Sequence, residues 1–277
     1  MAVQDAIQFK EQGNKLFLKG QYAGAEGLYS QATFRIVADP KDPKLYTNRA
    51  MARCKLRRWE DAIADCQTCL SLTPDNMKAI FYKAEAQLEL KDFDNALQSA
   101  QHAYELYSHS EDGLKSLGSV TKLVLRCKKE RWEDKERRRL RERSELEREL
   151  VELMENERGT AILLATNDAE LRDIQDEWEA KIETLRGTFQ LARGEQGKRR
   201  EVPDWAIDDI SFGIMVDPVM TKTGKSYERA SLMEHLKRSK TDPITREHLE
   251  VSDLRPNLDL RAACAEFLEE NGWAVDW

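Results

Sequence analysis

The chain has 277 residues, of which 34% are charged and 40% hydrophobic, and its formal net charge is -7. This length corresponds to two or three domains, and the hydrophobic content is sufficient to bury their cores. The acidic balance argues against a nucleic-acid-binding protein, because such proteins present a basic surface that neutralises phosphates.

Small residues recur along the N-terminal part of the chain, with steps of 37 and then 34 residues. The three series are Gly13, Ala50 and Ala84; Ala25, Ala62 and Ala96; and Ala32, Cys69 and Ala103. A 34-residue period with small residues at helix contacts is the signature of tetratricopeptide (TPR) repeats. The pattern predicts three helix pairs over about 6–39, 43–76 and 77–110, with the three extra residues around Pro40 and Pro43. Stacked repeats leave a concave groove, which the first helix of each repeat lines.

The middle segment, 128–200, is helical in character and strongly charged. Its first half has no Gly or Pro between Lys128 and Arg158. Its second half carries apolar residues three or four positions apart, the spacing of a coiled-coil seam: Leu171, Ile174, Trp178, Ile182, Leu185 and Phe189. We expect two helices joined by a short apolar connection at 161–165. An antiparallel hairpin that dimerises would bury this seam, and the alternative is a charged spacer that packs within its own chain.

The C-terminal segment, 202–277, predicts a small α+β domain. Thr223-Gly224 lies between two short apolar stretches and indicates a β-hairpin. Asn257 is placed to cap a last helix, whose inner face is formed by Leu260, Cys264, Phe267 and Leu268. One cysteine and two histidines are too few for the two zinc sites of a RING domain, so we expect no metal and no cofactor. The predicted fold is therefore multidomain and mainly α: residues 1–127 hold the repeats and the start of a long helix, followed by the hairpin and this domain.

Four motifs in the last segment resemble those of a U-box, the metal-free relative of the RING domain. They are Ile210-Ser-Phe212, Asp217-Pro218, Asp242-Pro-Ile-Thr-Arg246 and Asn271-Gly-Trp273. The order of TPR repeats, charged hairpin and U-box is similar to that of the co-chaperone E3 ubiquitin ligases, over nearly the whole chain. Lys10-Glu-Gln-Gly-Asn14 and Tyr46-Thr-Asn-Arg-Ala50 match the repeats of that family.

This resemblance implies a ubiquitin transferase that acts in protein quality control. The TPR groove would bind the acidic C-terminal tails of heat-shock chaperones, which end in Glu-Glu-Val-Asp. The U-box would recruit a ubiquitin-conjugating enzyme loaded with ubiquitin, and lysines of misfolded, chaperone-bound clients would receive the ubiquitin. The chain would act as a homodimer, without nucleic-acid or membrane partners and without a covalent ubiquitin intermediate of its own.

The resemblance also assigns binding residues in the groove. Lys10, Asn14, Asn48 and Lys78 correspond to the family's carboxylate clamp, and Phe81 to the apolar floor beneath an aliphatic side chain of the tail. Lys10 and Asn14 lie four residues apart and therefore on one helix face. Taken singly, each of these residues has an ordinary alternative as a solvent-facing or backbone-bonding side chain.

In the U-box, the resemblance assigns Ile210, Phe212 and Pro243 to the surface that receives the conjugating enzyme. Arg246 would bridge that enzyme and the ubiquitin tail and hold the thioester ready for attack, which is preorganisation rather than acid–base chemistry. The alternatives are that Phe212 belongs to the core and that Arg246 pairs with Glu247 or Glu250. His235 is expected to bond a neighbouring loop.

Two alternative functions are a non-catalytic dimeric adaptor with a degenerate U-box and a purely structural dimeric scaffold.

Cys66 and Cys69 have the spacing of a redox or zinc motif, but both fall at packed positions of a repeat, so buried and inert thiols are expected. Five scattered cysteines suit a reducing compartment. With no evident signal peptide and no apolar stretch of the ~18–20 residues that a membrane span needs, we expect a cytoplasmic protein that can also occur in the nucleus.

Overall fold

A computed structural model describes residues 2–35, 42–110, 113–194 and 201–277 of the chain. These residues form two compact units. The first unit contains Met1–Trp132 together with Asp204–Trp277, and the second contains Glu133–Pro203. Within the described residues, no helix is both long and apolar enough to cross a membrane.

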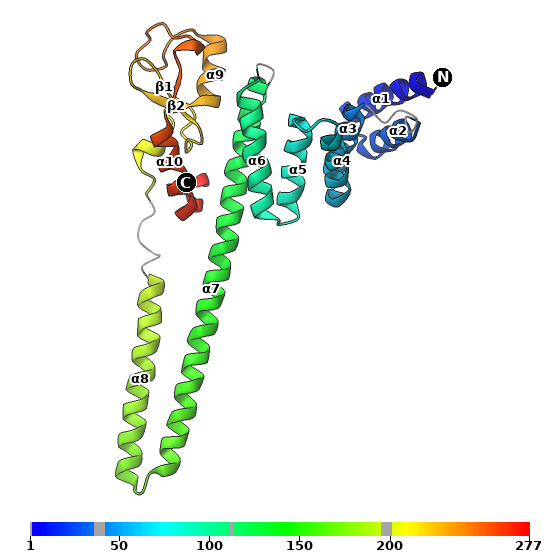
Figure 1. Cartoon of the computed structure of the whole chain (residues 1–277). Coiled ribbons are helices and arrows are strands. Elements are labelled where there is room, and N and C mark those ends of the chain that lie inside the picture. Colours follow the sequence, from blue (N-terminus) through cyan, green and yellow to red (C-terminus); the bar gives the residue numbers. More distant parts are fainter. Residues whose placement is uncertain (1, 36–41, 111–112, 195–200) are drawn as a thin grey trace. The chain divides into compact units, whose positions relative to one another are not determined.

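Three antiparallel helix pairs begin the first unit, as the sequence period predicts (Figure 1). They are α1 (Ala2–Leu18) with α2 (Tyr22–Arg35), α3 (Pro43–Lys55) with α4 (Trp59–Leu72), and α5 (Met77–Glu89) with α6 (Phe93–Ser108). The small residues of the three series are buried where these helices meet. At Gly13 a side chain could not fit, because an added Cβ would lie 2.6 Å from the Tyr29 ring. The predicted TPR-like repeats are thereby confirmed; residues 36–41, which include Pro40, lie outside the described residues.

Helix starts in the repeats follow from local hydrogen bonding. Asp42 caps α3, where its side chain accepts a bond from the Lys44 backbone N–H and Pro43 occupies the first turn. Asn76 caps α5 in the same way, through the N–H of Ala79. These caps fix the points at which the first helices of repeats two and three begin, and thereby the register of the residues that face the groove.

A charged network ties the first two repeats together. Asp65, which is 3% exposed, accepts bonds from Arg49 at 2.6 and 2.9 Å and from Arg53 at 2.8 Å. Arg53 also pairs with Glu26 on α2 at 3.0 Å. Because every buried charge here has a partner of opposite sign, the network orients α3 against α2 without an uncompensated charge.

The long helix α7 (Leu117–Leu164) starts by covering the last repeat. Its first turns bury apolar residues in one core cluster with α5 and α6; these are Leu117, Val120, Leu123, Val124 and Cys127. The rest of α7 belongs to the second unit, where it forms a hairpin with α8 (Asp168–Gly194).

The hairpin is antiparallel, since Arg143 near the middle of α7 bonds the carbonyl of Ala192 at the end of α8 at 3.0 Å. Asn167 caps α8 by accepting from the backbone N–H groups of Ala169 and Glu170. Ile182 of the predicted seam is 3% exposed, and the other seam residues are partly buried.

The expectation of a loop at 161–165 is wrong, because α7 continues through Leu164: the run Ala161–Leu164 consists of good helix formers that extend the helix to the polar turn. Residues 195–200 lie outside the described residues.

The C-terminal module closes the first unit with a small sheet and two helices (Figure 1). The strands β1 (Pro218–Met220), β2 (Ser226–Glu228) and β3 (Arg255–Pro256) are antiparallel, in the order β2-β1-β3. Gly224 supplies the left-handed turn of the predicted hairpin, with φ of 82°. Helices α9 (Arg229–Arg238) and α10 (Leu258–Glu270) follow, and Asn257 caps α10 as predicted. The core is formed by Val219, Tyr227, Leu232 and Leu249.

Polar contacts join this module to α6 and α7 within the first unit. The Tyr104 hydroxyl on α6 donates to Asp217 at 3.1 Å. The Trp132 indole on α7 donates to the carbonyl of Glu270 at 2.8 Å, and a Cβ added at Gly272 would lie 2.3 Å from Trp132. The absence of a side chain at Gly272 therefore lets the end of α10 approach the indole of α7.

Candidate functional sites

Two asparagines meet at the start of the predicted groove. The side-chain oxygen of Asn14 on α1 accepts from the amide of Asn48 on α3 at 3.1 Å and from the hydroxyl of Tyr29 on α2 at 2.8 Å. Tyr29 is fully buried, whereas Asn14 is exposed. Because the oxygen of Asn14 receives both bonds, its NH₂ group is left to donate outward, which is the orientation that an incoming carboxylate requires.

Lys10 lies one turn before Asn14 and already has an acidic neighbour. Its ammonium contacts the Asp42 carboxylate at 2.8 Å, across 32 residues of sequence. Two hydrogen bonds, from Lys10 and from the Lys44 backbone N–H, hold the pKa of Asp42 below its ordinary value against the opposing effect of partial burial. The cation assigned to the tail is therefore engaged by a side chain of its own chain.

Lys78 and Phe81 lie together on α5, apart from the Asn14–Asn48 contact. They share a cavity of about 220 Å³ with Tyr107 on α6 and with Ser119 and Val120 on α7. Lys78 is exposed and Phe81 half-buried, so the cavity combines a cation with an aromatic wall. The structure thus places the five predicted groove residues in two groups, on α1 with α3 and on α5, and packs α3 against α5.

Two loops of the C-terminal module, 207–214 and 241–248, carry the predicted docking residues, and we call them the docking loops. Their backbones have the same arrangement. An isolated bridge closes each loop at its base, Ile207 with Ile214 in the first and Thr241 with His248 in the second. In the first loop, the N–H of Phe212 donates to the carbonyl of Asp208 at 2.8 Å; in the second, the N–H of Arg246 donates to that of Asp242 at 3.0 Å. Both donors have positive φ, 57° for Phe212 and 61° for Arg246. A left-handed non-glycine residue is a strained conformation that persists only where its surroundings impose it.

Two buried aspartates supply these surroundings. Asp208 is fully buried, and its carboxylate accepts from Ser211 at 2.6 and 2.8 Å and from the Glu228 N–H at 2.9 Å. Asp242 is 1% exposed and accepts from two loop N–H groups at 2.9 and 3.0 Å and from the Tyr227 hydroxyl at 3.0 Å. Each carboxylate thus organises its loop through hydrogen bonds, which offset the cost of burying the charge.

The predicted docking residues differ in exposure. Phe212 is 72% exposed, which argues against the alternative that it belongs to the core. Ile210 is half-buried against the core and lines a cavity of about 290 Å³ with residues of α9. Pro243 is half-buried beside Ile244, which is 50% exposed and was not predicted. Arg246 is exposed, and among the described residues it has no ion pair with a glutamate.

His235 bonds a neighbouring loop, as expected. Its Nε2 lies 2.8 Å from the carbonyl of Thr241, the base residue of the second loop. This contact links α9 to that loop and gives the imidazole a positioning role.

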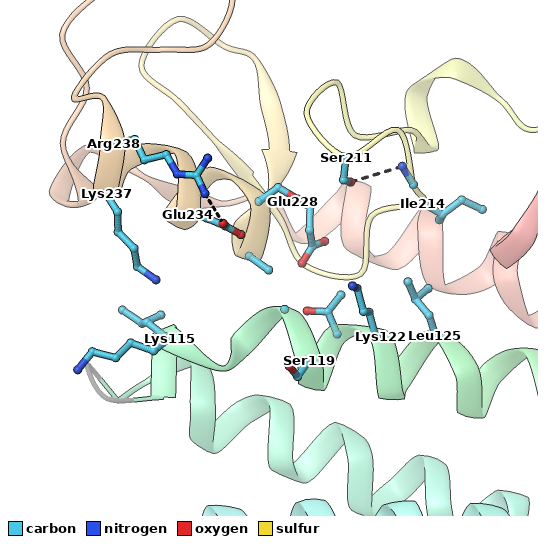
Figure 2. Close-up of a pocket in the computed structure, with 16 residues that line it drawn as sticks. Lys115, Ser119, Lys122, Leu125, Ser211, Ile214, Glu228, Glu234, Lys237 and Arg238 are labelled. Carbon is cyan, nitrogen blue, oxygen red and sulfur yellow. Dashed lines mark hydrogen bonds and ion pairs between the residues drawn. The ribbon is translucent and has the colours of Figure 1, made fainter. Parts of the chain in front are cut away.

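A larger cavity, of about 690 Å³, lies between the start of α7 and the C-terminal module (Figure 2). Lys115 and Lys122 line it from one side, and Glu228 and Lys237 from the other. One oxygen of Glu228 accepts from two backbone N–H groups, while the other is buried without a partner among the described residues. Burial raises the pKa of Glu228 to about 7. None of the predicted site residues lines this cavity.

The thiols of the chain are poorly suited to covalent chemistry. All five cysteines are buried and free. Burial raises the pKa of Cys69 and of Cys264 to about 11, and it raises the pKa of Cys66 further. At neutral pH these groups remain protonated, and a thiol rather than a thiolate is a poor nucleophile. The described residues also contain no cluster of three or more potential metal ligands.

Comparison with known proteins decides the family. Residues 202–273 match the U-box domain. The chain is 31% identical over 270 residues to the E3 ubiquitin-protein ligase CHIP of Arabidopsis thaliana, an alignment that covers 97% of this chain and 95% of that protein. The chain belongs to the CHIP family of U-box E3 ubiquitin ligases.

Further similarities concern the repeats of this CHIP-family chain. The Hsp70-Hsp90 organizing protein 2 of Arabidopsis thaliana is 31% identical over 134 residues, which cover 48% of this chain and 22% of that protein. A solved TPR2B-domain:pHsp70 complex of yeast Sti1 is 27% identical, with a TM-score of 0.41, and the match covers 45% of this chain and 96% of that one.

Four residues near the sites of this CHIP-family chain were not found from the sequence. Asp208 and Asp242 organise the docking loops, Tyr29 orients Asn14, and Asp42 engages Lys10. For Asp242 and Asp42 a signal existed, since an aspartate before proline indicates a turn or the start of a helix. For Asp208 and Tyr29, the decisive contacts join residues that only the folded chain brings together.

Proposed function

We propose that this chain is a co-chaperone ubiquitin ligase that binds acidic chaperone tails through its repeats and transfers ubiquitin to the clients those chaperones hold. The observation that carries the proposal is the match to CHIP along 97% of the chain, which includes repeats and U-box alike. The similarity of about half of this chain to the Hsp70-Hsp90 organizing protein 2 is consistent with chaperone partners.

In the proposed groove, Lys10, Asn14 and Asn48 bind carboxylates of the tail. Lys78 binds a second acidic group, and Phe81 contacts an aliphatic side chain beside it. The outward NH₂ of Asn14 and the cavity shared by Lys78 and Phe81 support these roles. A tail with two acidic groups and an apolar residue has the matching chemistry, and charge-assisted bonds to its carboxylates would give the specificity.

In the proposed transfer step, Phe212, Ile210 and Pro243 hold the conjugating enzyme, and Arg246 contacts both that enzyme and ubiquitin. The attacking group is a client lysine, and the thioester belongs to the conjugating enzyme. The ligase contributes proximity and orientation, which can accelerate a reaction without any chemistry of its own. The guanidinium of Arg246 is exposed and has no ion-pair partner among the described residues, so its five donors are available for that bridge.

We also propose that the hairpin dimerises and that the protein works in the cytoplasm and the nucleus. Exposed leucines on both hairpin helices support an intermolecular contact; they are Leu146, Leu153, Leu163, Leu164 and Leu191. A shallow cavity of about 560 Å³ between the helices is lined by Met154, Ala180 and Leu185 among others. A second copy would remove these apolar groups from water.

The transfer step is tested by reconstituted ubiquitination with activating enzyme, ubiquitin, ATP and a panel of conjugating enzymes. Ubiquitin chains should form with the wild type and be lost with Ile210→Ala. A folded wild type that binds the tail but supports no transfer with any conjugating enzyme would favour the adaptor reading instead.

A further inference from the structure

The acidic side chain of Asp42 contacts Lys10, a cation of the predicted groove. Its two oxygens have separate partners. One accepts from the Lys44 N–H at 3.0 Å and caps α3, and the other lies 2.8 Å from the Lys10 ammonium. The carboxylate is therefore held from two sides, by the start of α3 and by α1.

This position is the one that a bound tail must approach. Lys10 is one turn from Asn14, and Asn14 is bonded to Asn48. A carboxylate that bonds Asn14 and Asn48 would therefore come next to Lys10, where Asp42 already lies. The Lys10 and Asp42 side chains are 25% and 36% exposed, so solvent screens their attraction only in part. Tail binding then requires either that Asp42 gives up Lys10 or that two carboxylates share one ammonium, and like charges at that distance repel.

We propose that Asp42 is an affinity-determining residue of the groove, an internal carboxylate that competes with the acidic chaperone tail for Lys10. The inference rests on the proposed tail binding. In the free groove, Asp42 already neutralises the charge of Lys10. Weakly acidic C-termini cannot displace Asp42 and therefore bind poorly. Strongly acidic tails, which also engage Asn14, Asn48 and Lys78, displace it and bind.

The experiment is calorimetric titration of the full chain with an acetylated peptide that ends in Glu-Glu-Val-Asp. Asp42→Asn is the informative variant, because asparagine caps helices as well as aspartate does and its oxygen can still accept from Lys44. The oxygen that faces Lys10 is replaced by an NH₂ group, so Lys10 loses both the negative charge and its acceptor. We expect the peptide to bind about threefold to tenfold more tightly, with the gain shrinking at high salt.

Asp61→Asn is the matched control. Asp61 is half exposed on α4 and pairs with Arg58 at 2.7 Å, so this change removes the same charge from a surface pair away from the groove helices. Its affinity for the peptide should equal that of the wild type. Circular dichroism checks that both variants keep their helices.

The outcomes separate this inference from the function on which it rests. Tighter binding of the peptide by Asp42→Asn, but not by Asp61→Asn, supports the competition. Binding by the wild type with no gain in Asp42→Asn, or with the same gain in Asp61→Asn, overturns it while leaving the proposed tail binding intact. If neither the wild type nor Asp42→Asn binds the peptide, the proposed tail binding itself fails, and the competition fails with it.

Discussion

At the scale of single residues, buried polar side chains set the direction of exposed ones. Tyr29 orients Asn14, and Asp208 and Asp242 hold Phe212 and Arg246 in left-handed conformations. In each case a residue without solvent contact determines what its neighbour presents to a partner. Substitutions at these positions are therefore expected to alter binding or transfer while the exposed residue itself is unchanged.

Tyr29→Phe should weaken binding of the acidic tail by about twofold to tenfold, the equivalent of one lost hydrogen bond. The ring stays in place against Gly13, but the side-chain oxygen of Asn14 loses one of its two donors and keeps only Asn48. Calorimetry with the tail peptide measures the effect. Tyr22→Phe on the same helix is the control, because the recorded contact of Tyr22 is a ring contact with Phe17, which a phenyl ring retains. Equal affinity of Tyr29→Phe and the wild type would show that the Tyr29 hydroxyl is not needed to orient Asn14.

Glu228 predicts a dependence of stability on pH. Its folded pKa of about 7 is raised above the unfolded value of 4.5. The neutral form is therefore favoured in the folded state. The resulting stabilisation is complete below about pH 4.5 and is lost as the pH rises through about 7, by an amount on the order of 3 kcal/mol.

Glu228→Gln should abolish that loss, since glutamine is neutral and its oxygen can accept from the two N–H groups that Glu228 now bonds. Hydrogen exchange of β2 amides, compared between variants at the same pH, measures the local stability. The variant should be better protected than the wild type at pH 8 and equal to it at pH 5. Glu234→Gln, at an exposed position on α9, should match the wild type at both. If Glu228→Gln changed the protection of the β2 amides equally at pH 5 and pH 8, the raised pKa of Glu228 would be contradicted.

At the scale of elements, the hairpin carries the clearest prediction. Leu146 and Leu153 are 50% and 60% exposed on α7 and seven residues apart, which puts them on one face. If that face is the dimer contact, Leu146→Glu with Leu153→Glu should yield a monomer, because two charges would be buried without partners. Light scattering coupled to size exclusion measures the mass. Glu145→Gln, at a neighbouring exposed position, should remain a dimer. A double variant that stays dimeric would place the contact elsewhere.

Local signals in the sequence predicted most of the elements. The 34-residue period located the three helix pairs, the seam from Leu171 to Phe189 located α8, and Asn257 located the start of α10. The seam and the cap act within a helix or between sequence neighbours, and the 34-residue period is visible as a repeat along the chain. The end of α7 was missed because Ala161–Leu164 is apolar enough to suggest a connection, although its residues favour a helix.

The candidate sites were predictable only in part. The exposed residues could be assigned through the family resemblance, but the side chains that support them could not. The Asn14–Asn48 contact spans 34 residues and the Tyr104–Asp217 contact spans 113. Such pairs are set by how whole helices pack, and a buried aspartate in a loop looks the same in sequence as an exposed one.

At the scale of the whole molecule, two distinct surfaces serve one proposed reaction. In the proposed function, the groove holds the chaperone tail and the two loops hold the conjugating enzyme. The five thiols are buried, and burial raises the pKa of Cys264 to about 11, so these cysteines are poor nucleophiles. In the proposed reaction the ligase contributes by bringing a client lysine to a thioester held by another enzyme. Because the residues of the two surfaces are separate, substitutions in one should spare the function of the other.

The measurement that tests this account most directly is ubiquitination of a misfolded client presented by a chaperone with its acidic tail, with wild type, Lys10→Ala and Arg246→Ala assayed in parallel. The wild type should modify the client. Lys10→Ala should lose tail binding and client modification but keep self-ubiquitination, and Arg246→Ala should keep tail binding and lose both modifications. Client modification that persists in Lys10→Ala, or transfer unaffected in Arg246→Ala, would contradict the account.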